Sequence, residues 1–192
     1  MTWQGDVRLG VEAWGAGEPP PEDAEAVGPD ADAEAVARKI LLDQLTGRAR
    51  SRKELADRLA SKQVPADVAK ALLDRFEEVG LIDDEAFARL WITDRQRSKG
   101  LASRALSQEL RRKGVADEVV QEALDEVEPG AEEEVARALV RKKLRTLTRV
   151  DDATATRRLV GMLARKGYPS GLAFSVVRDE VRTAGRQCED DG

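Results

Sequence analysis

Apolar residues recur at intervals of three and four positions along most of the chain from Ala33 onward. This spacing places apolar side chains on one face of an α-helix. The first such stripe consists of Val36, Ile40, Leu41 and Leu45. No run of alternating apolar and polar residues is long enough to indicate a β-strand. The pattern therefore predicts an all-α protein.

The helical pattern occurs three times along the chain. Residues 102–127 align with residues 51–76 at a shift of 51, and residues 155–180 follow at a further shift of 53. The helix that precedes each stretch repeats as well, in the sequences EAVARKI, EAFARLW and EEVARAL. Agreement at so many positions predicts an internal repeat with three helices in each unit.

This repeat predicts the organisation of the chain. The expected three-helix units comprise residues 33–80, 83–128 and 131–184. Because isolated helices shorter than about 12–15 residues are marginal in water, each unit must bury its leucines against its own helices and its neighbours. We expect an all-α fold in which three tandem three-helix repeats form an elongated, curved, right-angle-packed body.

The two ends of the chain differ from this body. Residues 1–32 are rich in Pro, Gly and acidic residues without apolar periodicity, so we expect a disordered acidic tail there. We expect residues 185–192 to form a short acidic tail. The N-terminus lacks the profile of a signal peptide, and no stretch approaches the roughly 18 apolar residues of a membrane span. We therefore expect a cytoplasmic protein.

The stretch VGLIDDEAFARLW lies between the first and second units. Gly80 fits the position just past a helix end, with Leu81 as its hydrophobic contact. Asp83 is the expected N-cap of the next helix. Ile82 and Phe87 have the spacing of a hydrophobic staple. The stretch is therefore predicted to be a structural joint between two helices.

Further turns and acidic residues fit the same interpretation. Asp84 and Glu85 fall in the first turn of the predicted helix, where the helix dipole favours negative charge, so a metal or catalytic role is not needed to explain them. Gly114 and Gly167 are predicted helix stops, because glycine readily adopts the left-handed conformation. Gln63 takes this place in the first unit, where we expect a costlier or different turn.

Composition argues against an enzyme. The chain has no histidine, the commonest general base and metal ligand. Its one cysteine, Cys188, is followed by acidic residues that disfavour the thiolate. With 4% aromatic residues, the core must be aliphatic. We expect no catalytic residue, no metal and no cofactor.

The net charge of −5 hides a segregation of charges. Residues 1–34 contain nine acidic residues and one basic residue, whereas residues 35–187 contain 25 acidic and 31 basic residues. Basic clusters surround the second helix of each predicted unit, which suggests a shared surface that we call the basic stripe. It consists of Arg52, Lys53, Arg97, Lys99, Arg104, Arg111, Arg112, Lys113, Arg141, Lys142, Lys143, Arg157, Arg158 and Lys166.

The basic stripe has two interpretations. It lacks aromatic residues on which bases could stack, so as a binding surface it favours phosphate or carboxylate groups without sequence choice. Any single cluster also fits a solvated surface. Cations near a helix C-terminus are stabilising as well, which applies to residues 111–113.

The motifs GLIDDEAFARLW (80–91) and RSKGLASRALSQELRRKGV (97–115), within the triple repeat, resemble the RecX family of regulators of the bacterial recombinase RecA. The resemblance covers about residues 35–182. It implies an elongated helical protein that lies in the groove of the RecA–DNA filament. It further implies that this protein restrains filament growth, ATP hydrolysis, strand exchange and coprotease function in DNA repair and recombination, without chemistry of its own. The acidic N-terminal segment and Gln63 depart from the pattern.

Other functions remain open at this level. A direct, sequence-nonspecific DNA-binding module is the main alternative, because short helix pairs with a basic second helix enter DNA grooves. A generic helical scaffold would explain the fold alone. The expected partners are RecA and its DNA filament, with weak nonspecific DNA contact and no membrane. We expect the chain to be a monomer.

Overall fold

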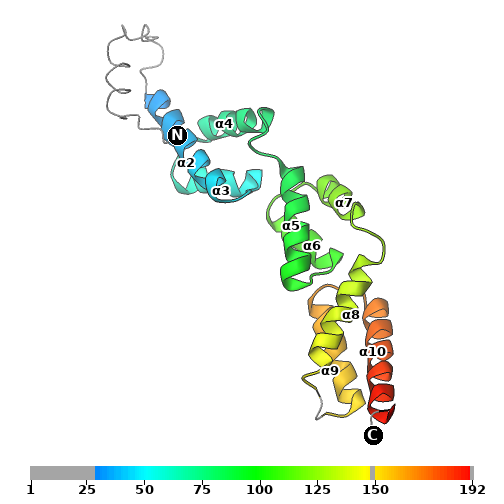
Figure 1. The fold of residues 1–192 in the computed structure, drawn as a ribbon. Coiled ribbons are helices and arrows are strands. Elements are labelled where there is room, and N and C mark those ends of the chain that lie inside the picture. Colours follow the sequence, from blue (N-terminus) through cyan, green and yellow to red (C-terminus); the bar gives the residue numbers. More distant parts are fainter. Residues whose placement is uncertain (1–28, 148–149, 191–192) are drawn as a thin grey trace, which may run out of the picture.

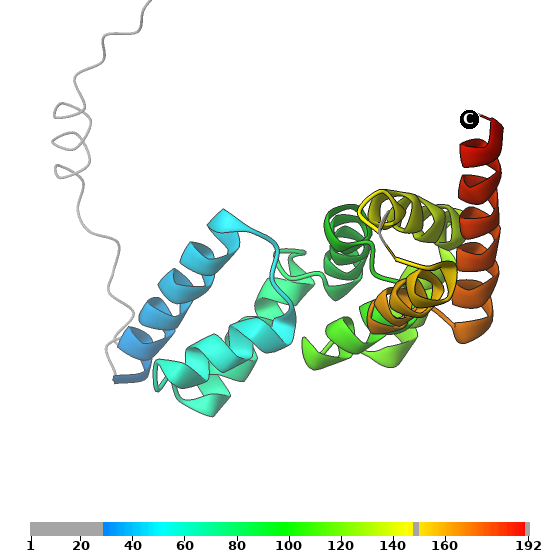
Figure 2. The same ribbon diagram turned by 90° about the horizontal axis from the view of Figure 1, so that it is seen from below.

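The computed structural model describes residues 29–147 and 150–190, with side-chain environments for residues 33–147 and 150–184. Within these residues the chain is helical and contains no strand. Three bundles follow one another in a row, and the first and third lie at opposite ends in both views (Figures 1 and 2). Extensive packing between helices occurs only within each bundle. The described part of the chain is therefore an elongated series of three three-helix units, as the repeat predicts.

The first unit buries its leucines between three helices. Leu41, Leu55, Leu59 and Leu72 are at most 2% exposed. The predicted disordered tail of residues 1–32 lies mostly outside the described residues. Residues 29–32, however, belong to the first helix, so the predicted boundary of the tail is four residues too late. The helices are α2 (Pro29–Gly47), α3 (Arg52–Ser61) and α4 (Ala66–Glu78).

The second unit begins at the predicted N-cap. Asp83 Oδ1 accepts a hydrogen bond of 2.8 Å from the Ala86 N–H, which satisfies one of the unpaired donors of the first turn. Its core combines Leu106 and Leu110 with Phe87, whose ring stacks on Trp91 at 5.7 Å. The helices are α5 (Asp84–Lys99), α6 (Ser103–Arg112) and α7 (Asp117–Asp125).

The third unit contains the longest helix of the described residues. Its core contains Val140, Leu159, Leu163 and Val176, and Ala102 from the start of the second unit's middle helix packs into it. The last helix continues to Asp190, so the backbone of residues 185–190, expected as a tail, is helical. The helices are α8 (Ala131–Leu144), α9 (Asp152–Arg165) and α10 (Ser170–Asp190).

The same turn ends the second helix of each unit. Gln63, Gly114 and Gly167 have φ angles of 60°, 80° and 91°. In each unit the next apolar residue donates its N–H over 3.2 Å to a leucine carbonyl of the helix it leaves, as Val64 does to Leu59. Gln63 therefore does not change the turn, but it adopts a conformation that disfavours a side chain.

The stretch between the first two units differs in part from the prediction. Gly80 has φ 72° and ends α4 as expected. Leu81 is 49% exposed and does not provide the hydrophobic contact, whereas Ile82 is 2% exposed and packs into the first core. Phe87 packs into the second core. Ile82 and Phe87 thus anchor the stretch in two different cores instead of forming one staple.

Candidate functional site

The first and second units meet where the N-terminus of α3 packs against the end of α6. The buried Ser51 Oγ donates a hydrogen bond of 2.6 Å to the Lys113 carbonyl, and the Arg52 N–H donates to Asp84 Oδ1 over 2.8 Å. Lys113 Nζ forms an ion pair with Glu54 at 2.7 Å. We call these contacts the first joint. A helix end of one unit is thereby satisfied by groups of the next.

The second and third units meet through the corresponding groups, which we call the second joint. Ala102 and Ser103 align with positions 51 and 52 of the first unit. The Ala102 N–H donates to the Lys166 carbonyl over 2.9 Å, and the Ser103 N–H donates to Glu132 Oε2 over 3.1 Å. Lys166 Nζ also donates to the Lys99 carbonyl. The two joints therefore repeat one mode of contact.

Two acidic residues of the helix starts have a second role in these joints. Asp84 and Glu132 lie in the first turns of α5 and α8, where the helix dipole favours negative charge. Each also accepts from a backbone N–H at the second helix of the preceding unit. Sequence reasoning missed this role because it depends on the position of a neighbouring unit. The recurrence of acidic residues at both helix starts was the only available signal.

Close approach explains why two of the three turns contain glycine. A Cβ atom at Gly167 would lie 2.7 Å from the Ala105 nitrogen of the preceding unit, and one at Gly114 would overlap the Lys53 side chain. Gln63 is exposed and belongs to the first unit, which has no preceding repeat. A side chain is therefore sterically possible there.

The first joint also changes the pKa of two of its acidic groups. Partial burial works to raise the pKa of Glu54, but the hydrogen bonds from Lys113 and the Ser51 N–H outweigh it and leave the pKa below its ordinary value. Burial raises the pKa of Asp84, and the Arg52 N–H offsets this only in part. The first joint thus contains one carboxylate stabilised by its contacts and one penalised by desolvation.

The second joint contains a buried tyrosine. The Tyr168 hydroxyl donates to the Gly100 carbonyl over 3.2 Å. Burial, together with the nearby Glu132 carboxylate, raises the pKa of Tyr168 to about 12. The hydroxyl therefore stays protonated at neutral pH and keeps its hydrogen bond across the joint.

Lys113 packs against the aromatic side chains of the second unit. Its ammonium group lies 4.1 Å from the centre of the Trp91 ring, and the Arg95 guanidinium lies 4.0 Å from that ring. Trp91 Nε1 donates to Glu109 over 3.0 Å. These cation–π contacts and this hydrogen bond hold the end of α6 near the first joint.

The basic stripe divides into two groups. Arg52, for example, forms ion pairs with Asp74 and Glu77 inside the first unit, and Arg141 donates to the buried Glu180 over 2.8 Å. Members engaged in ion pairs or joint contacts are Arg52, Lys53, Arg111, Lys113, Arg141 and Lys166. Exposed members without an ion pair to any described residue are Arg97, Lys99, Arg104, Arg112, Lys142, Lys143, Arg157 and Arg158.

Positive charge is concentrated in the third unit. Residues 131–184 contain twelve Lys and Arg residues and seven Asp and Glu residues, a balance of +5. Four of the exposed, unpaired members of the stripe lie there, on α8 and α9. Any polyanionic partner is therefore attracted most strongly to this end of the molecule.

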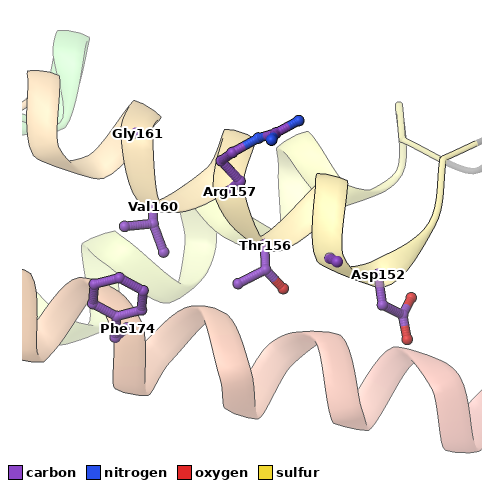
Figure 3. Close-up of a pocket in the computed structure, with 7 residues that line it drawn as sticks. Asp152, Thr156, Arg157, Val160, Gly161 and Phe174 are labelled. Carbon is purple, nitrogen blue, oxygen red and sulfur yellow. The ribbon is translucent and has the colours of Figure 1, made fainter.

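An apolar groove lies between α9 and α10 of this unit. It has a volume of about 610 Å³ and is lined by residues that include Thr156, Arg157, Val160 and Phe174 (Figure 3). Phe174 is 57% exposed. Asp152, Thr156 and Arg157 provide its polar side chains, and no hydrogen bond or ion pair joins these three residues.

Two other features are absent from the described residues. No cluster of three or more His, Cys, Asp or Glu side chains there is arranged to hold a metal ion. No helix in the described part is long and apolar enough to cross a membrane. The features that remain are the two joints and the exposed cations along the row of units.

Three family models match the chain in order and cover its three units. They are described as the first, second and third three-helix domains of RecX, and they match residues 37–76, 83–124 and 131–177. The matched ranges fall within the three bundles of the structure.

Individual proteins agree with these models. Regulatory protein RecX of Amycolatopsis mediterranei is 46% identical over 151 residues, which are 79% of this chain and 86% of that protein. Regulatory protein RecX of Streptomyces lividans is 46% identical over 166 residues, 86% of this chain and 88% of that protein. The crystal structure of RecX from Lactobacillus salivarius has the same fold, with a TM-score of 0.71 at 19% identity over 78% of this chain and 97% of that chain. The chain therefore belongs to the RecX family of regulatory proteins.

Proposed function

We propose that the protein binds the RecA recombinase and its nucleoprotein filament, and thereby inhibits filament extension, ATP hydrolysis, strand exchange and coprotease activity. Membership of a family of regulatory proteins supports a regulatory role. The protein would act in the cytoplasm as a monomer, without catalysis of its own, and would modulate DNA repair and recombination. RecA is the partner that the resemblance to the RecX family implies.

The repeated joint is the observation that carries this proposal. Both joints are built from corresponding elements: the N-terminus of the second helix of one unit and the turn after the second helix of the next. Successive units are therefore presented in a row with related contacts. A row of similar units suits a partner that is itself repetitive, such as a filament. Several weak contacts along the row then add up to strong binding, although each one is weak.

The exposed cations of the basic stripe are the proposed contacts. Lys142, Lys143, Arg157 and Arg158 form no ion pair with described residues and belong to the most basic unit. Charged groups of this kind accelerate association and select complementary surfaces. They would contact RecA carboxylates or DNA phosphates along the filament.

Filament binding and strand exchange test the proposal. The wild-type protein is titrated onto preassembled RecA filaments and into a strand-exchange reaction. A variant with these four cations replaced by Gln is expected to need a severalfold higher concentration for the same inhibition, while its unfolding midpoint stays unchanged. Strand exchange that proceeds normally with stoichiometric wild-type protein would rule out the proposed activity.

The number of engaged units is tested separately. A chain that lacks residues 131–192 is expected to lose a large part of its filament affinity, because one set of additive contacts is gone. The stability of the first two units should change far less. Unchanged affinity in this shortened chain would rule out binding through several units.

Direct, sequence-nonspecific binding to DNA is the second candidate function. The unpaired cations on α8 and α9 favour it, because they can neutralise phosphates without a protein partner. It predicts binding to duplex DNA in the absence of RecA, with an affinity that falls steeply as salt is raised. An affinity for DNA too weak to measure at low salt would remove this candidate.

A further inference from the structure

A polar cavity lies at the second joint, between α6 of the second unit and α9 and α10 of the third. Its volume is about 350 Å³, and Arg104, Gln108, Arg165 and Ser170 are among the residues that line it. None of the described lining residues is acidic. Neither arginine forms an ion pair with any residue of the described part of the chain. Two cationic groups therefore border one cavity without forming an ion pair, and the carboxylate of this joint, Glu132, is hydrogen-bonded to Ser103 instead.

At the aligned positions of the first joint, the chain supplies carboxylates that neutralise the positive charge. Arg104 and Gln108 of the cavity align with Lys53 and Asp57 at the shift of 51. In the first joint Lys53 Nζ and Asp57 Oδ2 form an ion pair at 2.6 Å. The replacement of Asp57 by an uncharged amide in the second unit leaves Arg104 without the partner that Lys53 has.

Two further acidic positions that align with the cavity are also lost. Asp117, which pairs with Arg111 at 2.6 Å, aligns with Ser170 at the shift of 53. Glu54, which pairs with Lys113, aligns with Ala105. The carboxylates of Asp57, Glu54 and Asp117 thus align with the uncharged cavity residues Gln108, Ala105 and Ser170, whereas the remaining carboxylate of the first joint, Asp84, is retained at the second as Glu132.

We propose that this cavity at the second joint is a binding site for a phosphate group. Guanidinium groups present planar sets of N–H donors that match the oxygens of phosphate, and the Gln108 amide and Ser170 hydroxyl add neutral donors. The volume of about 350 Å³ far exceeds the roughly 30 Å³ occupied by a water molecule. The phosphate belongs either to the backbone of a nucleic acid or to a small phosphate anion.

A phosphate in this position contacts both units at once. Arg104 comes from α6 of the second unit, whereas Arg165 and Ser170 come from α9 and α10 of the third. Binding therefore stabilises the second joint in the form seen here, because a ligand stabilises the state that binds it. The first joint, which supplies its own carboxylates, lacks this response.

The test compares two double variants with the same change in charge. Arg104→Gln with Arg165→Gln removes both arginines from the cavity. Lys53→Gln with Arg112→Gln removes the aligned residues of the first joint and serves as the control. Because each double variant loses two positive charges, a difference between them reports the site and not the overall charge of the protein.

Two measurements are made on the full chain without RecA. The first is the thermal unfolding midpoint in phosphate against chloride at equal ionic strength, since phosphate also stabilises proteins by general exclusion and the control carries that contribution. The second is the affinity for a fluorescent oligonucleotide. We expect the cavity variant to lose the specific phosphate stabilisation, and to bind the oligonucleotide about tenfold more weakly than the control if the phosphate belongs to nucleic acid.

The outcomes separate the two sources. Loss of both effects in the cavity variant, or of oligonucleotide affinity alone, identifies a site for nucleic-acid phosphate. Loss of phosphate stabilisation with normal oligonucleotide binding identifies a site for a small phosphate anion. If the two double variants respond alike to both ligands, the phosphate site does not exist. Because RecA is absent, this result leaves the proposed regulation of the filament untouched.

Discussion

Replacement of Gly167 by alanine probes the contact that repeats along the chain. Gly167 has φ 91°, and a Cβ there would lie 2.7 Å from both the backbone nitrogen and the Cβ of Ala105 in the second unit. Gly80→Ala is the matched control. Gly80 has φ 72°, but no described atom lies within 4 Å of the position its Cβ would take. The pair therefore separates backbone conformation from contact between units.

The expected magnitudes follow from these two geometries. A left-handed conformation costs a residue with a Cβ about 1–2 kcal/mol, and the smaller entropy of unfolded alanine returns about 0.4–1 kcal/mol. Gly80→Ala should therefore lower the free energy of unfolding by roughly 1 kcal/mol. Gly167→Ala adds overpacking against Ala105, which costs a further ~1–3 kcal/mol. Because the nearest atoms include backbone, the second joint has to open to relieve the overlap.

Two measurements distinguish the variants. Urea unfolding gives the stabilities, and energy transfer between dyes at Glu122→Cys in α7 and Ala153→Cys in α9 reports the spacing of the second and third units, with Cys188 replaced by Ser. We expect a changed transfer efficiency in Gly167→Ala and an unchanged one in Gly80→Ala. Equal stability losses and equal efficiencies would refute the steric account of this joint.

Three further predictions concern the turns and caps. Gln63→Gly should raise the free energy of unfolding by a few tenths to about 1 kcal/mol in urea titrations, because relief of the left-handed strain exceeds the entropic cost of glycine; a loss of stability would contradict the turn. Asp83→Ala should lower it by ~0.5–2 kcal/mol, measured in the same way, because the N-cap hydrogen bond is lost. The pKa of Glu54 is lowered in the folded state, so its ionised form adds stability that is present above the ordinary pKa of 4.5 and lost as the pH falls through the folded value. The stability difference between wild type and Glu54→Gln should therefore shrink below about pH 4.5, and a difference that is constant down to pH 3 would contradict the ion pair with Lys113.

The repeat and its cores were predictable because they depend on local spacing. Leu55, Leu106 and Leu159 align in the sequence, and each is at most 1% exposed. The N-cap at Asp83 and the helix stop at Gly80 follow from residue type and position alone. These features need no information from elsewhere in the chain.

Contacts between units could not be predicted in this way. Asp84 satisfies a backbone N–H that lies 32 residues earlier, and no periodicity indicates such a pair. Ile82 and Phe87 have staple spacing, but the chain leaves one core and enters another between them. The basic stripe was likewise drawn from charge alone, whereas ion pairs such as that of Lys53 with Asp57 depend on side-chain geometry.

Single-strand-dependent ATP hydrolysis by RecA, measured while this protein is titrated in, tests the central claim most directly. A regulator that binds the filament through successive units is expected to lower the hydrolysis rate progressively as it is added, with strong inhibition at stoichiometric amounts. Gly167→Ala, in which the second joint is forced open, should be a weaker inhibitor than Gly80→Ala at equal folded protein. An undiminished rate at stoichiometric wild-type protein would contradict the account.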